Sequence, residues 1–83
     1  MPKSTHTGEY DRFRLLLVKA RKKAGLSQAQ LAERLRKPQS FVSKFERGER
    51  RLDVVEFKHV AEAVGVDPLR FLRRAYGPKD GPK

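Results

Sequence analysis

The 83-residue chain carries 20 lysine or arginine residues against 10 aspartate or glutamate residues, and its formal net charge of +10 predicts a polyanionic partner such as DNA, RNA or an anionic membrane surface. A chain of this length favours one domain and excludes a second hydrophobic core. Because it has no cysteine, disulfides and thiolate metal sites are excluded, and a reducing cytosol is compatible with the composition.

The N-terminal part divides into a polar lead and a first helix. Residues 1–9, MPKSTHTGE, are polar and are expected to be disordered. A first helix is predicted from about Tyr10 or Asp11 to Ala24, and Gly25 follows where a left-handed residue would end it. Apolar residues recur along this segment at helical spacing, namely Phe13, Leu16, Leu17, Ala20 and Ala24.

Two short helices separated by a tight break follow. Ser27 and Gln30 form a capping-box pattern in front of a second helix predicted over residues 28–35. A third helix is predicted over residues 38–47, because Pro38 fits a first helical turn but cannot continue the preceding helix. The inward-facing residues would be Leu31, Ala32, Leu35, Val42 and Phe45.

The last third of the chain predicts two further helices. Asp53 and Glu56 form a second capping pattern before a helix over residues 54–64, and Gly65 ends it. Asp67 caps a fifth helix that begins with Pro68. The apolar stripe of the fourth helix is Phe57, Val60, Ala61 and Val64, and the apolar side of the fifth is either Leu69, Leu72 and Ala75 or Phe71 and Tyr76.

These elements predict an all-α domain over residues 10–76, followed by a flexible, turn-rich tail, GPKDGPK, over residues 77–83. No internal repeat and no strand pattern occurs. Two short helices with polar residues where the second one starts suit a helix-turn-helix, whose second helix enters the DNA major groove.

Three blocks of sequence carry a resemblance to a known family. They are LSQAQLA at residues 26–32, S-x-x-S-K-F-E-R-G at residues 40–48, and E-F-x-x-V-A-E-A-V-G-V at residues 56–66. With these spacings the chain resembles the lambda-repressor-like helix-turn-helix family, also called the Xre or Cro/repressor family, over about residues 13–67. The resemblance implies a compact five-helix DNA-binding domain in which helices 2 and 3 form the helix-turn-helix.

The resemblance also implies which residues read bases. The predicted positions are Gln39, Ser40 and Lys44, with Ser43 as a contact to a base or a phosphate. Glutamine can pair with adenine and lysine with guanine in the major groove. Two interpretations of Phe41 stand equally: it contacts a thymine methyl group, or it packs over the preceding helix.

Phosphate contacts are implied for a second set of residues. Gln28 would hold a phosphate at a helix N-terminus, where free N–H groups and the helix dipole favour an anion; the alternative is a solvated first-turn residue. The other implied phosphate contacts are Arg47, Arg50 and Arg51, with Arg36 and Lys37 in the turn as weaker candidates. The alternative for these residues is a solvated run of charge.

The resemblance further implies a structural ion pair between Arg21 of the first helix and Glu46 at the end of the recognition helix. The chain departs from the family pattern at the turn between helices 2 and 3. Arg36 stands where the family often has glycine, and Pro38 stands where it has a Ser or Thr cap. Lys37 is therefore an alternative cap residue, and the reach of Gln39 depends on the geometry of this turn.

Little in the sequence supports an enzyme, a metal, a cofactor or a membrane protein. The two histidines, His6 and His59, are expected to face solvent, and no nucleotide-binding or metal-ligand motif occurs. The longest apolar run is far shorter than the roughly 20 residues that span a bilayer, and no secretory signal precedes it. The expected location is cytoplasmic.

The resulting hypothesis is a sequence-specific, double-stranded-DNA-binding transcription repressor that binds a pseudo-palindromic operator as a homodimer. Phe71, Leu72 and Tyr76 are predicted to form the dimer interface, with completion of the monomer core as the alternative. Two rival hypotheses are an antitoxin or adaptor that uses the same fold to hold a protein partner, and a non-specific nucleic-acid binder that relies on charge alone.

Overall fold

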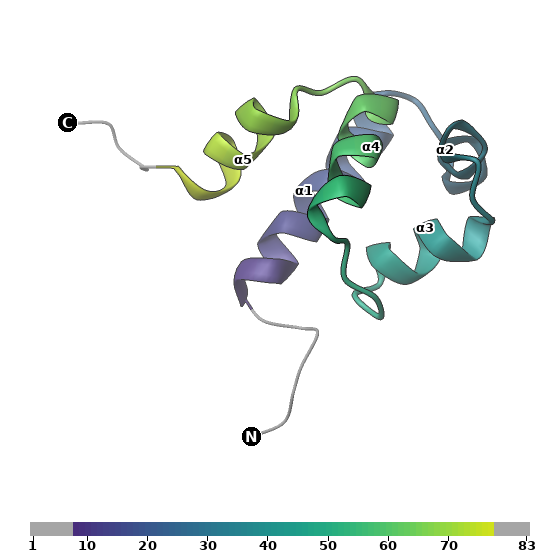
Figure 1. Ribbon diagram of the computed structural model, residues 1–83, viewed down its shortest axis with the longest axis horizontal. Coiled ribbons are helices and arrows are strands. Elements are labelled where there is room, and N and C mark those ends of the chain that lie inside the picture. Colours follow the sequence, from purple (N-terminus) through teal and green to yellow (C-terminus); the bar gives the residue numbers. More distant parts are fainter. Residues whose placement is uncertain (1–7, 78–83) are drawn as a thin grey trace.

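The computed structural model describes residues 8–77, and in that range the chain forms five helices and no strand. The helices are α1 (Gly8–Lys23), α2 (Gln28–Leu35), α3 (Gln39–Glu46), α4 (Val54–Val64) and α5 (Pro68–Tyr76). The predicted all-α class with five helices is confirmed. Figure 1 shows α2 and α3 at one end of the molecule and α5 at the other.

The first helix begins two residues earlier than its apolar periodicity predicted. Gly8 and Glu9 belong to α1 and not to a disordered lead. The Glu9 carboxylate lies in the first turn, where the helix dipole favours negative charge. The Glu9 carbonyl oxygen also accepts a hydrogen bond from the Tyr76 hydroxyl, which ties this turn to α5. The remainder of the predicted lead, residues 1–7, and the tail from residue 78 onward lie outside the described residues.

The caps predicted from sequence set the starts of α2, α4 and α5. At α2, the Ser27 hydroxyl accepts a hydrogen bond from the backbone N–H of Gln30 at 3.0 Å, and the side-chain oxygen of Gln30 accepts one from the backbone N–H of Ser27 at 2.8 Å. Asp53 and Glu56 make the same reciprocal pair at α4. Both capping boxes are confirmed, and each satisfies backbone donors that a helix start leaves without a partner.

The turn between α2 and α3 is built on a left-handed arginine. Arg36 has φ of 58°, and it is the one non-glycine residue with positive φ among the described residues. Pro38 then adopts an extended conformation, with ψ of 155°, and is the N-cap of α3. The prediction that α3 starts at Pro38 was therefore wrong by one residue, and Lys37 is not the cap. Since proline has no side-chain acceptor, α3 starts without a side-chain cap.

Replacing Arg36 with glycine should stabilise the fold. A side chain in the left-handed region costs roughly 1–2 kcal/mol that glycine does not incur, and part of this gain is lost to the greater entropy of the unfolded chain. We expect Arg36→Gly to raise the free energy of unfolding by about 0.5–1 kcal/mol in urea denaturation. Lys37→Gly removes the same charge at the adjacent residue, whose φ is not positive, and should not stabilise the protein.

The core lies where α1 and α4 pack against the helix-turn-helix on one side and against α5 on the other. Its fully covered members include Leu17, Leu31, Val42, Phe45 and Val60, all predicted to face inward. Three phenylalanines join α1, α4 and α5: the Phe13, Phe57 and Phe71 rings have centroids 5.2 to 5.8 Å apart. Ala24 is exposed because α1 ends at Lys23, so its predicted place on the apolar face was wrong.

The packing of α5 distinguishes the three residues that were predicted to form the dimer interface. Its inward residues are Phe71 and Ala75, a combination that neither sequence alternative contained. Phe71 is 8% exposed and stacks within the aromatic cluster, so it completes the monomer core. Leu69 and Tyr76 are instead 72% and 47% exposed, and Leu72 is half-buried.

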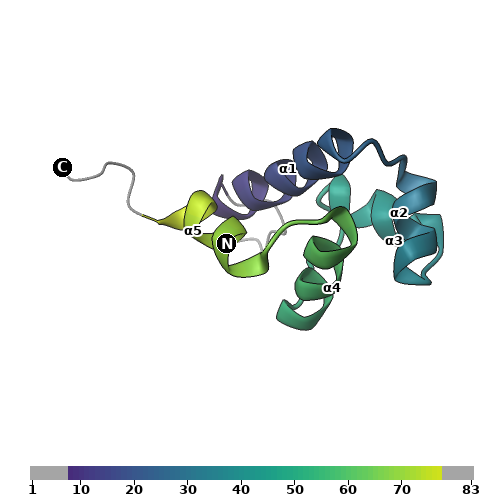
Figure 2. The ribbon, with the colours of Figure 1, turned by 90° about the horizontal axis from the view of Figure 1, so that it is seen from above.

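The packing order separates the two ends of the domain. Helix α2 packs on α3 and α4, α3 packs on α1, and α5 packs on α1 and α4. Figure 2, a view from above, also places α5 at the end of the molecule away from α2 and α3. The outer surface of α3 is thus distant from α5.

Candidate nucleic-acid interface

Helix α3 divides cleanly into a buried and an exposed face. Val42 and Phe45 have no exposed surface and fix the helix against the core. The predicted base-reading residues Gln39, Ser40 and Lys44 are all exposed. Ser40 and Lys44 are four residues apart and therefore lie on one side of the helix. The sequence produces this arrangement because its apolar residues occupy only the opposite side of α3.

A chain of polar contacts connects this exposed face to the core. The side-chain amide nitrogen of Gln39 (Nε2) donates to the side-chain oxygen of Gln28 (Oε1) at 3.4 Å. The side-chain amide nitrogen of Gln28 donates in turn to a carboxylate oxygen of Glu46 at 2.9 Å. Glu46 is in turn held by Arg21, through N–O distances of 2.7 and 3.0 Å. The side chain of Gln28 is therefore oriented by α3 and is not a freely solvated first-turn residue.

The Arg21–Glu46 ion pair is buried and fully hydrogen-bonded. Arg21 and Glu46 are 8% and 7% exposed, and the arginine also donates to the Leu26 carbonyl oxygen at 2.7 Å. Arg14 donates to the backbone carbonyl of Glu46 at 2.5 Å and pairs with Asp11. Two arginines of α1 thus bind the C-terminal turn of α3. Their positive charge is favoured there because the helix dipole places partial negative charge at the C-terminus.

Phe41 packs against the edge of the core, next to Phe45 of the same helix. It is half-buried, and its ring meets Phe45 edge-on with centroids 5.7 Å apart. The Lys37 ammonium lies 5.4 Å from the Phe41 ring centroid and the Arg50 guanidinium lies 4.8 Å from it. The ring therefore supports two cations beside the recognition helix. A contact between Phe41 and a thymine methyl group stays a prediction.

The arginines of the loop after α3 are engaged with neighbouring carboxylates and aromatic rings. Arg47 binds Glu49 at 2.9 and 3.1 Å and donates to the Ser43 hydroxyl at 2.8 Å. Arg50 binds Glu56 through two hydrogen bonds of 2.9 and 2.7 Å. A phosphate contact by either arginine requires the carboxylate to be shared or displaced.

The guanidinium of Arg51 has a different neighbour. It lies 4.6 Å from the centroid of the Tyr10 ring. Tyr10 is buried, and its hydroxyl accepts a hydrogen bond from the Leu52 N–H at 3.1 Å. Burial raises the pKa of this hydroxyl above its ordinary value. The start of α1 thereby fixes the loop that follows α3, a role that the sequence analysis did not assign to Tyr10.

Arg14 and Glu56 were also missed as parts of this surface. Arg14 lies seven residues before Arg21, a spacing that places both on one side of α1, and this was the available signal. Glu56 was recognised as a cap, but its second partner, Arg50, is fixed only by the path of the loop.

The Arg50–Glu56 pair makes stability depend on pH at the acid end. Hydrogen bonds from Arg50 and then from the Asp53 backbone lower the pKa of Glu56 from 4.5 to about 2. Because the folded pKa is the lower one, the stabilisation is complete above pH 4.5 and is lost as the pH falls from 4.5 to about 2. Water screens the pair, so the contribution is at most about 1 kcal/mol.

Glu56→Gln should remove this acid-side dependence while leaving the capping contact to the Asp53 N–H, which an amide oxygen can accept. We expect denaturation midpoints of the variant to fall less steeply between pH 4.5 and about 2 than those of the wild type. Glu62→Gln, in the exposed Lys58–Glu62 pair, is the matched control and should retain the wild-type slope. Equal slopes in all three proteins would contradict the assignment.

Other chemistry finds no support in the described part of the chain. No group of three or more histidine, cysteine, aspartate or glutamate residues within residues 8–77 is placed to hold a metal ion. His59 is exposed, and His6 lies outside the described residues. Among the helices of residues 8–77, none is long and apolar enough to cross a bilayer.

Comparisons with known proteins agree with this geometry. A family model described as Helix-turn-helix matches residues 17–71. Among solved structures, the chain is similar to an XRE-family like protein from Pseudomonas syringae pv. tomato str. DC3000, with 48% sequence identity and a TM-score of 0.79. The match covers 81% of this chain and 82% of that chain. A comparison with curated proteins gave no match.

Proposed function

Because the chain belongs to the Xre, or lambda-repressor-like, helix-turn-helix family, which is DNA-binding and not enzymatic, we propose that it is a sequence-specific regulator of transcription. The observation that carries this proposal is the exposed polar face of α3. Its apolar side is locked into the core, and its outer side presents Gln39, Ser40 and Lys44 without covering elements. A helix of this kind fits the major groove.

Within the groove, the three exposed residues would have distinct tasks. Gln39 lies in the first turn of α3 and is suited to adenine, since its amide can donate to N7 or accept from N6. Lys44 can donate to guanine O6 and N7. The hydroxyl of Ser40 can donate or accept a hydrogen bond, so it can contact adenine or guanine. Ser43 is a weaker candidate, because its hydroxyl already accepts a hydrogen bond from Arg47.

Phosphates would be bound on both sides of α3. Gln28 is at the start of α2, and its contact with Gln39 would fix the base-reading amide relative to the bound phosphate. The charged groups of Lys37 and Arg51 lie over the Phe41 and Tyr10 rings, respectively, and both residues are exposed. For Arg47, which is 57% exposed, a phosphate would take the place of Glu49. Arg50 links α3 to α4, because its guanidinium stacks on the Phe41 ring of α3 and binds Glu56 of α4.

Binding as a homodimer follows from the limited reach of one recognition helix. Leu69 and Tyr76 are seven residues apart on one side of α5, with half-buried Leu72 between them. We propose that this stripe, and not Phe71, pairs two copies about a two-fold axis. Two α3 helices would then read half-sites about one helical turn apart in a pseudo-palindrome. A dimer seated on such an operator would repress by blocking access to the DNA.

Selection of bound sites from random duplex DNA tests this proposal. We expect a consensus made of two inverted half-sites, bound in preference to competitor DNA. The salt dependence of binding should have a slope near −0.9 per phosphate neutralised. Failure to enrich any consensus would contradict sequence-specific regulation and favour binding by charge alone. A single half-site would contradict the dimer but not the recognition helix.

A further inference from the structure

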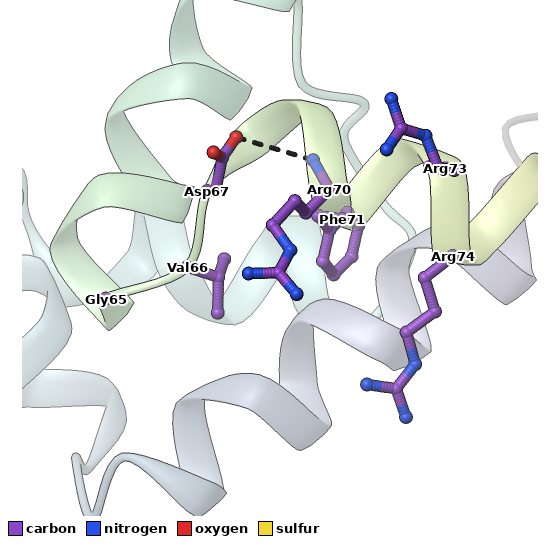
Figure 3. A pocket seen from close by; sticks show the side chains of 7 residues that line it. All are labelled: Gly65, Val66, Asp67, Arg70, Phe71, Arg73 and Arg74. Atoms are coloured by element: carbon purple, nitrogen blue, oxygen red, sulfur yellow. Dashed lines mark hydrogen bonds between the residues drawn. The ribbon is translucent and has the colours of Figure 1, made fainter.

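A groove runs between α1 and α5, on a part of the surface that the proposed DNA contacts do not use. Its floor is apolar and is formed by Leu16 and Ala20 of α1, Val66 of the α4–α5 link and the edge of Phe71. Figure 3 shows its extension along α5, where Arg70 and Arg74 flank Phe71. The floor residues are packed against the core, so the groove is a fixed feature of the domain.

The rim of this groove is strongly basic. Lys19 and Lys23 line it from α1, and Arg70 and Arg74 line it from α5. All four are exposed, and none makes an ion pair with another residue in the range 8–77. Asp67 is the one acidic residue in the lining, and its carboxylate is occupied as the N-cap of α5, as Figure 3 shows for its contact with the Arg70 backbone.

We propose that the α1–α5 groove docks an acidic amphipathic helix of a protein partner. Such a segment would place apolar side chains on the floor and carboxylates against the four rim cations, so that shape and charge match on both sides. A nucleic-acid backbone fits less well, because its phosphates gain nothing from an apolar floor. The rim charges lie on two helices that face each other across the floor, as an amphipathic helix requires.

Occupation of this groove leaves the recognition helix accessible. Figures 1 and 2 place α5 and α3 at opposite ends of the domain. The exposed stripe of Leu69 and Tyr76 also lies on a different side of α5 from Arg70 and Arg74, because residues one position apart differ by about 100° around a helix. The domain would therefore hold an acidic partner while α3 reads DNA, and the groove would bind that partner whether or not DNA is present.

The probe for the test is a synthetic peptide of about 18 residues, with leucines along one helical face and glutamates flanking them. Amide resonances of the ¹⁵N-labelled full chain should shift on α1 and α5 and not on α3. The double variant Lys19→Glu/Arg74→Glu should bind the peptide about tenfold more weakly, because two attractive charge contacts become repulsive. Lys22→Glu/Lys58→Glu changes the net charge equally outside the groove and should bind within about twofold of wild type.

Further measurements separate this occupant from the others. A peptide of the same composition, with its leucines spread around the helix, should bind more weakly; equal binding would overturn the role of the apolar floor. Shifts in the groove caused by non-specific duplex DNA, and abolished by the double variant, would assign it to nucleic acid instead. Loss of self-association in the double variant would assign it to a second copy. The resonance map is measured on the wild type, so it tests the proposal even if the double variant does not fold. Peptide-induced shifts on α3, or no shifts on α1 and α5, would overturn the proposal.

Discussion

Replacing Glu46 with glutamine is expected to lower the free energy of unfolding by about 3–5 kcal/mol. The substitution keeps the shape of the side chain but leaves the Arg21 guanidinium buried without a counter-charge. Arg21 is 8% exposed, so water cannot replace the lost carboxylate. Urea denaturation followed by circular dichroism at neutral pH measures this loss, which is a large fraction of the 5–15 kcal/mol that stabilises a typical domain.

Glu62→Gln is the matched control for this loss. Glu62 accepts from Lys58 at 3.2 Å across one turn of α4, but both side chains are more than half exposed. Such a pair contributes about 0.3–0.5 kcal/mol. If Glu46→Gln were as mild as Glu62→Gln, the buried pair would not be a principal attachment of α3 to α1.

A second variant separates the stability of the pair from its positioning role. Arg21→Met/Glu46→Met removes both charges together, and apolar replacement of a buried pair often restores stability. The double variant should therefore unfold with a free energy closer to that of the wild type than Glu46→Gln. It should still bind operator DNA less well, because Gln28 loses the carboxylate that orients it. Wild-type DNA affinity in the double variant would contradict a positioning role.

The features that the sequence predicted correctly are local ones. Ser27 with Gln30 and Asp53 with Glu56 are capping pairs separated by three residues, so their contacts depend on one turn of helix alone. The resemblance marked Arg36 as the position where the family often has glycine, and the structure shows that Arg36 adopts the left-handed conformation there. The number of helices and most inward residues of α2 to α4 followed from apolar periodicity in the same way. For α1, periodicity identified Phe13 and Leu17, but it missed Tyr10 and wrongly included Ala24.

The features that the sequence missed depend on tertiary neighbours. Either side of α5 looked apolar, and only the positions of Phe13 and Phe57 decide that Phe71 is the inward residue. The contact between Arg50 and Glu56 was missed because nothing in the sequence brings these two residues together. The start of α3 was predicted one residue too early, at Pro38. The φ of proline suits both an N-cap and a first helical position, and only ψ distinguishes the two.

The resemblance to the family supplied what periodicity could not. The spacing of 25 residues between Arg21 and Glu46 carries no local signal, and their pairing was inferred from the family pattern alone. The contacts of Gln28 with both Glu46 and Gln39 are the geometric addition that the structure makes. They indicate that the proposed base-reading amide of Gln39, the proposed phosphate contact of Gln28 and the buried ion pair form one hydrogen-bonded network.

Gln39→Ala should relax the DNA consensus at one position in each half-site and leave the other positions unchanged. A bidentate side-chain contact to a base contributes about 1–3 kcal/mol of discrimination, which corresponds to roughly 5- to 150-fold in affinity between the preferred base and its competitors. Site selection with the variant, followed by titration of single-base substitutions, measures this. An unchanged consensus would refute the role of Gln39 while leaving that of the recognition helix intact.

Lys37→Ala distinguishes base reading from phosphate binding. A phosphate contact carries no direct sequence information, so this variant should weaken binding to all sites equally and reduce the salt slope by about 0.9. Gln28→Ala combines both effects, because Gln28 is the proposed phosphate ligand and also accepts the hydrogen bond from Gln39. Because glutamine carries no charge and neutralises no phosphate, the variant should weaken binding to all sites while the salt slope stays unchanged. At the position read by Gln39, it should relax the consensus less than Gln39→Ala does. Retained selectivity at that position would show that Gln39 is oriented by the DNA and not by Gln28.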